Sequence, residues 1–392
     1  MHNRPFDYAL TQRGLVDKVS LGVICPAVDS RILESWLYKI HQRHEPSQTE
    51  KDHLLSFPGF QSVFGLPIEI PQPGNVGWVT CPELDQNLNE KDGALRLAQN
   101  IVQAVTTLQA ACSPSVTLIF IPDRWRKWRK FETEEETFDL HNFVKAFAVE
   151  KGISTQFLER ETMDYPYQCR IWWWLSLAFY VKSMRTPWAL ESLDHDTAFV
   201  GLGFSLDRKA EKGKHIVLGC SHLYNARGEG LQYRLSKIEN PVIRRGNPFM
   251  SRDDAQRVGE TIRELFFDAR SRLPRRVVIH KQTPFLKDER EGLREGLSGV
   301  DDVEMLEIHI DHALRYVASV PKPDGSFRED NYPVKRGTVV KLDQHTALLW
   351  IHGVAPAVNP ALKYYKGKRR IPAPLVLKRG SSGSRVGDFG AF

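Results

Sequence analysis

The sequence has 392 residues, of which 41% are hydrophobic and 26% charged, as expected for a globular chain with more than one domain. The formal net charge of +6 permits a polyanionic partner without requiring one. No uninterrupted apolar stretch approaches the roughly 18 residues of a membrane helix, and residues 1–14 lack the apolar region of a secretion signal. The cysteines are scattered, without metal-ligand spacing: Cys25, Cys81, Cys112, Cys169 and Cys220. These features argue against a membrane protein, a disulfide framework and structural zinc, and indicate a reducing, cytoplasmic compartment.

Strands and helices alternate in the first half of the chain. Residues 18–26 and 115–122 have the composition of strands, and residues 31–44 and 93–111 have the apolar periodicity of helices. Strands that are apolar on both faces and alternate with helices predict a parallel sheet covered on both sides, which is a Rossmann-like architecture. A dinucleotide-binding metabolic enzyme is one alternative, but the glycine-rich GxGxxG motif is absent.

The stretch DLHNFVKAFAVEKGISTQF covers residues 139–157 and predicts a capped helix followed by a strand. Asp139 is a suitable N-cap, and Gly152 suits the position directly after the helix. A strand at 153–157 and a second, apolar helix at 168–182 follow. The stretch therefore places polar side chains beside a stripe of buried ones.

Four polar residues of this region are candidates for a phosphate site. His141 and Lys145 lie one turn apart on the first helix, Gln156 lies on the strand, and Lys182 lies near the end of the second helix. If these elements converge, two cations and an amide would surround an anion. In the alternative interpretation, His141 and Lys145 form a solvated helix rim, and Lys182 is a cation favoured by the helix dipole.

A basic segment, RWRKWRK at residues 124–130, directly follows the strand at 115–122. Ligands of open α/β sheets bind at the carboxyl ends of strands, so this segment is a candidate for phosphate attraction and base stacking. Its candidate nucleotide-contacting residues are Arg124, Trp125, Arg126 and Lys127. The alternative is a solvated basic face with Trp125 and Trp128 packed on the core.

The second half has a different order of predicted elements. Three successive strands are followed by helix, strand, helix and further strands, at residues 197–206, 214–223, 229–238, 251–273, 275–280, 286–297, 303–310, 337–343 and 346–353. This order is typical of an RNase H-like fold. The stretch at 183–196 is the predicted boundary, which gives a first domain at 1–185 and a second at 186–392.

These residues resemble two domains of prokaryotic Argonautes. The run from IPDRW through DLHNFVKAFAVEKGISTQF to LSLAFYVKSMRTPW resembles the MID domain, with residues 1–185 including an N-terminal extension. AFVGLGFSLDR and RRVVIHKQTPF resemble strands of the RNase H-like PIWI domain. The resemblance implies that His141, Lys145, Gln156 and Lys182 bind the 5′-phosphate of a guide nucleic acid. It also implies Mg²⁺ at that phosphate as a candidate cofactor.

The chain departs from slicing Argonautes at two catalytic positions. The positions of two metal-binding aspartates are occupied by Gly203 and Gln282. Because two-metal hydrolysis needs clustered carboxylates, the sequence predicts no slicing activity and no enzymatic activity in this chain. An active RNase H-like nuclease that uses the displaced acids Asp196, Asp207 and Asp288 is the alternative.

The resemblance is to short prokaryotic Argonautes, because no PAZ-like domain precedes the MID-like region. Such proteins act with an APAZ-domain partner that carries a TIR-like, sirtuin-like or nuclease effector. The resemblance implies a defence role, in which a guide, RNA or DNA with RNA favoured, pairs with complementary single-stranded invader DNA and activates the effector. The family's usual C-terminal apolar helix is not evident in residues 378–392. Candidate contacts to the nucleic-acid backbone are Lys335, Arg336, Lys363, Lys366, Lys368, Arg369 and Arg370.

Overall fold

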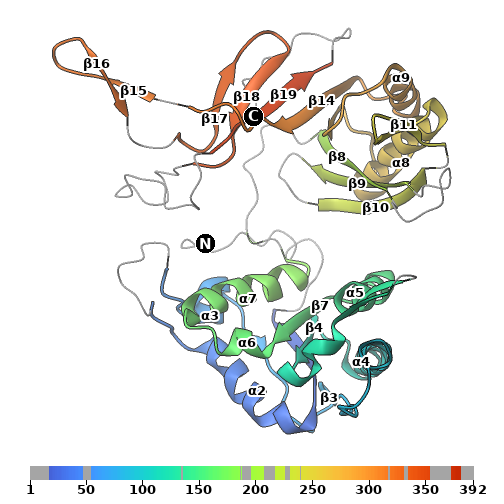
Figure 1. The fold of residues 1–392 in the computed structure, drawn as a ribbon, viewed down its shortest axis with the longest axis vertical. Helices are drawn as coiled ribbons and strands as arrows, with labels where there is room; N and C mark the ends of the chain where they lie inside the picture. Colours follow the sequence, from blue (N-terminus) through green and yellow to red (C-terminus); the bar gives the residue numbers. More distant parts are fainter. Residues whose placement is uncertain are drawn as a thin grey trace. The chain divides into compact units, whose positions relative to one another are not determined.

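The computed structural model divides into two compact units, Met1–Ala189 (unit 1) and Leu190–Phe392 (unit 2) (Figure 1). It describes residues 17–46, 54–133, 136–185, 187, 196–206, 217–225, 230–238, 240–316, 318–330, 334–353 and 372–380. Within these residues, every helix is too short or too polar to cross a bilayer.

A parallel sheet forms the centre of unit 1. Its strands are β1 (Val19–Cys25), β2 (Ile68–Glu69), β3 (Trp78–Thr80), β4 (Val116–Ile121) and β7 (Thr155–Glu159). The order is β2-β1-β4-β7, with β3 beside β1, and every pairing is parallel. A small antiparallel hairpin, β5 (Lys130–Glu132) and β6 (Thr137–Asp139), lies between β4 and β7 in the chain. The predicted parallel sheet is therefore present.

Helices cover both faces of this sheet (Figure 1). They are α2 (Ser30–Leu37), α3 (Phe60–Phe64), α4 (Glu90–Cys112), α5 (Leu140–Glu150), α6 (Arg160–Met163) and α7 (Gln168–Lys182), with 3₁₀ turns η1 (Ala27–Asp29), η2 (Tyr38–His41) and η3 (Asp123–Trp128). Side chains of β4 alternate between two cores, as strand geometry requires. Leu118 packs in the core that contains Phe179 of α7, and Ile119 packs in the core that contains Val144 of α5. Helices α5 and α7 therefore lie on opposite faces.

Helix α5 begins and ends as its sequence predicts. The Asp139 carboxylate accepts a hydrogen bond from the Asn142 N–H at 3.1 Å, which satisfies one of the free donors of the first turn. Gly152 has a φ of 67°, the left-handed conformation that stops a helix. The chain then turns back into β7, so α5 lies beside that strand.

A mixed sheet forms the centre of unit 2. Its order is β10-β9-β8-β13-β14-β19-β18-β17. The strands are β8 (Thr197–Leu206), β9 (Val217–Asn225), β10 (Gly230–Ile238), β13 (Arg276–Lys281), β14 (Asp302–Ile310), β17 (Thr338–Lys341), β18 (Thr346–Trp350) and β19 (Leu375–Arg379). Strands β8, β9 and β10 form an antiparallel meander, and β8, β13 and β14 are mutually parallel. This is the predicted RNase H-like arrangement, so the α/β fold class is confirmed for both units.

The sequence did not predict strand β19. This strand pairs with both β14 and β18, and so it joins the hairpin of β17 and β18 to the rest of the sheet. Two further hairpins are β11 (Val242–Arg244) with β12 (Asn247–Phe249), and β15 (Ala318–Pro321) with β16 (Phe327–Asp330).

Two helices of unit 2, α8 (Arg252–Arg270) and α9 (Lys287–Gly296), cross at unusually close range. A Cβ atom on Gly292 would lie 2.1 Å from the Arg252 carbonyl oxygen, and one on Gly296 would lie 2.1 Å from that of Gln256. Only glycine allows this approach, because any side chain there would overlap the backbone of α8.

Candidate nucleic-acid interface

Lys145 of α5 and Lys182 of α7 meet at one backbone oxygen. The Lys145 Nζ donates to the Thr155 carbonyl oxygen at 2.9 Å, and the Lys182 Nζ donates to the same oxygen at 2.7 Å. The two nitrogens can therefore be no further apart than the sum of these distances. Because the two helices lie on opposite faces of the sheet, their long side chains reach around its edge to meet.

Thr155 offers this oxygen because β7 is the last strand of the sheet. The preceding carbonyl, that of Ser154, accepts the Thr117 N–H of β4 at 2.8 Å. Since successive backbone groups of a strand point to opposite sides, the Thr155 carbonyl points to the unpaired edge. The two ammonium groups thus cover an edge carbonyl that no neighbouring strand satisfies.

The lysine pair, Lys145 and Lys182, has no carboxylate partner among the described residues. Burial, followed by the charge of Lys145, lowers the pKa of Lys182 from 10.5 to about 8. Two ammonium groups about 5 Å apart repel each other by about 3 kcal/mol at an effective dielectric constant of about 20. An anion bound between them would relieve this repulsion, so the pair is electrostatically suited to a phosphate.

Gln156 lies next to the lysine pair and completes its hydrogen bonds. Its Oε1 accepts from the Lys182 Nζ at 2.6 Å, and its Nε2 donates to the Phe157 carbonyl oxygen at 2.7 Å. The amide therefore holds the ammonium of Lys182 in place and remains a neutral donor beside it.

His141 lies one turn before Lys145 on α5, and among the described residues its ring forms no hydrogen bond with either lysine. The centroid of its ring lies 5.1 Å from that of Phe157, and its Nδ1 is 3.3 Å from the Asn142 Oδ1. The structure thus brings Lys145, Gln156 and Lys182 into one network and places His141 at its margin, exposed to solvent. Thr155 is the member that sequence reasoning missed. It contributes a backbone oxygen, and a pattern of side chains in the sequence cannot show which backbone oxygen will be exposed.

The basic segment 124–130 has very different surroundings. Arg124 forms ion pairs with Glu83 and with Asp29, the latter at 2.6 Å. Further along the segment, Arg126 is paired with Glu161, Arg129 with Glu159 at 2.9 Å, and Lys130 with Asp139 at 2.8 Å. Lys127 donates to the Gln86 carbonyl oxygen at 2.5 Å. The positive charges that suggested phosphate attraction are therefore largely neutralised within the unit.

The tryptophans of this segment belong to the core. Trp125 is 1% exposed and Trp128 is fully buried, and both pack against α4 and β4 residues such as Ile119 and Ala94. Neither ring has an open face, so the expectation that they stack on a base does not agree with the structure. Their spacing, three residues apart in η3, places both on the same side of a 3₁₀ turn, which explains their shared burial.

The basic segment and the lysine pair also lie at different ends of β7. The lysines converge on Thr155, the first residue of the strand, whereas Arg129 pairs with Glu159, the last. Four residues of extended chain separate the two by about 13 Å. The lysine pair therefore lies near the amino end of the parallel sheet, and not at the carboxyl end where open α/β sheets usually bind ligands.

In unit 2, the two positions predicted to have lost catalytic acids lie in neighbouring strands. Strand β8 pairs with β13 in register up to Leu202 and Lys281, so Gly203 is the next residue of β8 and Gln282 directly follows the end of β13. Both are exposed, and a Cβ atom on Gly203 would have no atom within 4 Å. The glycine is therefore not required by packing.

Directly before Gln282, Lys281 forms a buried ion pair. Its Nζ lies 2.5 and 2.7 Å from the two carboxylate oxygens of Glu289, which also accept the N–H groups of Met250 and Leu286 at 2.9 Å each. Desolvation lowers the pKa of Lys281, opposed by the charge of Glu289. This carboxylate is fully used within the protein.

The displaced acids considered above do not gather beside Gly203. Asp196 precedes β8 and is paired with Arg272, at the opposite end of the strand and about 23 Å of extended chain away. Asp288 is exposed in the first turn of α9, and Asp207 lies outside the described residues. Within those residues, no group of three or more His, Cys, Asp or Glu side chains is placed to hold a metal ion.

The donor set around Thr155 does not suit Mg²⁺. Magnesium prefers six oxygen ligands that include carboxylates. Here the Thr155 carbonyl and Gln156 Oε1 are already bound by ammonium groups, and no described carboxylate pairs with either lysine. Two cations at the same oxygen would repel a divalent ion, so these residues do not fit Mg²⁺.

Lys335 and Arg336, two of the candidate backbone contacts, are exposed on the turn before β17. The others, Lys363, Lys366, Lys368, Arg369 and Arg370, lie outside the described residues.

No family model matches the chain, and no curated protein matches it by sequence. Solved structures do match it. A. aeolicus Argonaute is 16% identical with a TM-score of 0.54, over 98% of this chain and 43% of that one. Drosophila Piwi is 14% identical with a TM-score of 0.57, over 97% and 44%. Clostridium butyricum Argonaute, bound to a guide DNA and a 19-mer target DNA, is 12% identical with a TM-score of 0.56, over 94% and 43%.

These matches cover nearly all of this chain and less than half of each solved chain. At such low identity they establish the fold and leave the activity open. The chain therefore has an Argonaute-like fold, with a Rossmann-like unit 1 and an RNase H-like unit 2.

Proposed function

We propose that this chain is the guide-binding subunit of a prokaryotic defence system, and that unit 1 anchors a 5′-phosphorylated guide. The observation that carries the proposal is the lysine pair on the Thr155 carbonyl, which has no carboxylate partner among the described residues. A terminal phosphate carries up to two negative charges and several acceptor oxygens, which match two ammonium groups and the Gln156 amide.

On this proposal, His141 contacts the phosphate or the first base from the margin of the site. The guide, with RNA favoured over DNA, pairs with complementary single-stranded DNA of an invader. The Argonaute-like fold supports this assignment because sequence would be read by base pairing, and the protein would hold the backbone. An effector linked to an APAZ domain in a separate partner would then be activated.

We also propose that the chain itself does not cut the target. Gly203 and Gln282 supply no carboxylate where the pairing of β8 with β13 stops, and Asp196 lies before the opposite end of β8. Incubation of the purified chain with a guide, a labelled matched target and Mg²⁺ or Mn²⁺ should leave the target intact. Cleavage that depends on the guide and the metal would contradict this and favour the active nuclease.

The direct test compares 5′-phosphorylated with 5′-hydroxyl RNA and DNA oligonucleotides at fixed salt. The wild type should prefer the 5′-phosphate, and Lys145→Ala combined with Lys182→Ala should bind both ends equally. The salt concentration is kept fixed because contacts to the nucleic-acid backbone weaken as ionic strength rises. At one salt concentration, the difference in affinity between the 5′-phosphorylated and 5′-hydroxyl forms then reports on the terminal phosphate alone.

A matched control removes the same charge elsewhere in unit 1. Arg31→Ala combined with Lys39→Ala takes away two exposed cations that lie outside both the lysine pair and the basic segment, and should keep the preference for the 5′-phosphate. If the control loses the preference, the effect reflects net charge. If the wild type binds both ends equally, the lysine pair is only a charged rim and the proposal fails.

A further inference from the structure

A cleft lies in unit 1 at the amino end of β1, apart from the lysine pair. It has a volume of about 670 Å³, a size typical of small-molecule sites. Short strands cover the edge of β1 only in part, since β2 pairs with Val19 and Ser20 and β3 with Val23 to Cys25. The loop 70–77 between them contains Pro71 and Pro73, which have no N–H to donate to the ladder. The cleft occupies this gap.

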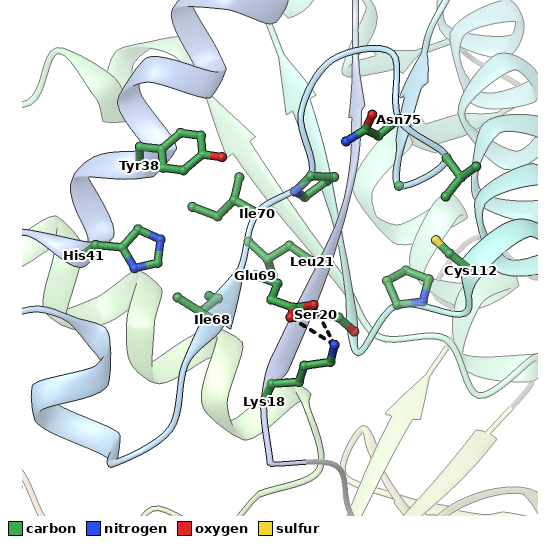
Figure 2. Close-up of a pocket in the computed structure, with 14 residues that line it drawn as sticks. Lys18, Ser20, Leu21, Tyr38, His41, Ile68, Glu69, Ile70, Asn75 and Cys112 are labelled. Atoms are coloured by element: carbon green, nitrogen blue, oxygen red, sulfur yellow. Dashed lines mark hydrogen bonds and ion pairs between the residues drawn. The ribbon is translucent and has the colours of Figure 1, made fainter.

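The floor of the cleft is apolar and its charges are neutralised. Leu21, Ile68 and Ile70 form the base in Figure 2. Lys18 and Glu69 lie at one end and pair with each other at 2.9 and 3.0 Å. A charged ligand would find no unpaired opposite charge here, which disfavours a phosphate and favours a neutral molecule.

Three uncharged polar side chains face the cleft from opposite walls. Tyr38 and His41 lie on one wall, and Asn75 lies on the other (Figure 2). Within the described residues, none of these three side chains has a hydrogen-bond partner, so their donors and acceptors are available. Burial lowers the pKa of His41, which keeps its imidazole neutral at pH 7.

The rings of Tyr38 and His41 and the amide of Asn75 indicate which class of ligand the cleft can bind. The Tyr38 and His41 rings are 6.0 Å apart between centroids and tilted by 44°, a surface suited to packing against a planar ring. The Asn75 amide can donate and accept at once, which matches the edge of a nitrogen heterocycle. We propose that this cleft binds a neutral, planar nitrogen heterocycle of nucleoside size. It does not depend on the lysine pair.

Two sources could supply such a ring: a free nucleoside-like molecule, or a base of a bound nucleic-acid strand. The chain carries a reporter, because Cys112 lines the cleft and is exposed, whereas Cys25, Cys81 and Cys169 are buried. In a Cys220→Ser background, alkylation of Cys112 by N-ethylmaleimide can be followed by mass spectrometry. Burial raises the pKa of Cys112, so mildly alkaline conditions suit the reaction.

Adenosine or uridine should slow the alkylation of Cys112 in a saturable manner, whereas ribose should not. Asn75→Ala and Tyr38→Phe should each weaken the protection by about three- to tenfold, the effect of losing one or two hydrogen bonds. Asn87→Ala, an exposed asparagine outside the cleft, is the matched control and should leave protection unchanged. Saturation-transfer-difference NMR with adenosine provides a readout that is independent of the thiol.

Protection by nucleosides alone would identify a free small molecule as the ligand. Protection only by an oligonucleotide, lost in Asn75→Ala, would identify a base of a bound strand. The proposal is overturned if neither protects Cys112 and no NMR transfer is seen, or if ribose and nucleosides act equally. Its failure would leave the 5′-phosphate preference of the lysine pair untouched.

Discussion

The lysine pair and the basic segment 124–130 are both positive regions of unit 1, but only one lacks internal counter-charges. The segment has five cations in seven residues, and most of them form ion pairs with acidic side chains from β7 and other elements. The lysine pair has two cations and shares one carbonyl oxygen. Local charge density in a sequence therefore does not show which cations are neutralised within the fold. The tertiary contacts show it, because they place carboxylates beside the segment and none of the described ones beside the lysine pair.

The two regions differ in ion pairing because they lie in different parts of unit 1. The basic segment is anchored by Trp125 and Trp128, whose burial fixes the backbone so that neighbouring arginines meet acids on the same surface. The lysines extend from two helices to an edge strand, where their acceptors are the Thr155 carbonyl oxygen and the Gln156 side-chain amide. Five experiments test this explanation.

The largest effect is expected in the basic segment, on stability. Trp128→Ala should lower the free energy of unfolding by about 3–5 kcal/mol, because it leaves a cavity in a closed core. Denaturant unfolding measures this. Trp174→Ala, at a tryptophan that is 63% exposed on α7, is the matched control and should change little. Equal effects of the two changes would mean that Trp128 is not held in the core and could stack on a base after all.

The next effect concerns binding at the lysine pair. Lys182→Ala should weaken binding of a 5′-phosphorylated guide by about 2–4 kcal/mol, the cost of removing one partner from a largely desolvated charged contact. Binding of the 5′-hydroxyl form should change far less. Fluorescence anisotropy at fixed salt distinguishes the two ends. The assignment of Lys182 would be wrong if both forms weakened by the same factor.

The pH dependence of the 5′-phosphate preference follows from the lowered pKa of Lys182. Free protein loses this proton as pH rises through about 8, so the preference should fall above that pH, by at most about tenfold per pH unit for one proton. Lys182→Arg keeps its charge and should remove this dependence. A flat profile in the wild type would contradict the shift.

The same shift predicts an opposite trend in stability without ligand. Between about pH 8 and 10.5 the unfolded chain keeps a proton that the folded chain has released, so the free energy of unfolding should rise with pH across this window. Subtracting the profile of Lys182→Arg from that of the wild type isolates the contribution of this residue.

The smallest effect is expected at Lys127. Its ammonium is exposed and donates to a backbone oxygen, so Lys127→Ala should change the free energy of unfolding by less than about 0.5 kcal/mol and leave the 5′-phosphate preference intact. A loss of that preference in this single variant would restore the basic segment as a guide contact.

Much of the fold follows from local sequence signals. Asp139 and Gly152 set the ends of α5 as predicted, because capping depends on a few neighbouring residues. The apolar run of β4 was predicted as a buried strand for a similar reason. Strand β19 was not predicted, since a five-residue strand is decided by its partners, β14 and β18, which are distant in the sequence.

The candidate site was predicted in part. Residue types and spacing pointed to Lys145, Gln156 and Lys182, and the structure brings the three together. The same reasoning overrated the basic segment, because it could count cations but could not see Glu83, Glu159 or Glu161 approaching from other elements. The neutralised arginines and the buried tryptophans became visible only with tertiary contacts.

Local sequence signals were enough to predict the alternation of strands and helices and the caps of α5, and to place Gly203 and Gln282 at the two positions where catalytic acids were expected. These are properties of single residues and near neighbours. Which charges are paired became visible only in the folded chain, because an ion pair needs two side chains that the fold brings together. The fold also brings Lys145 and Lys182, from helices on opposite faces of the sheet, to the same acceptor, the Thr155 carbonyl oxygen at the sheet edge.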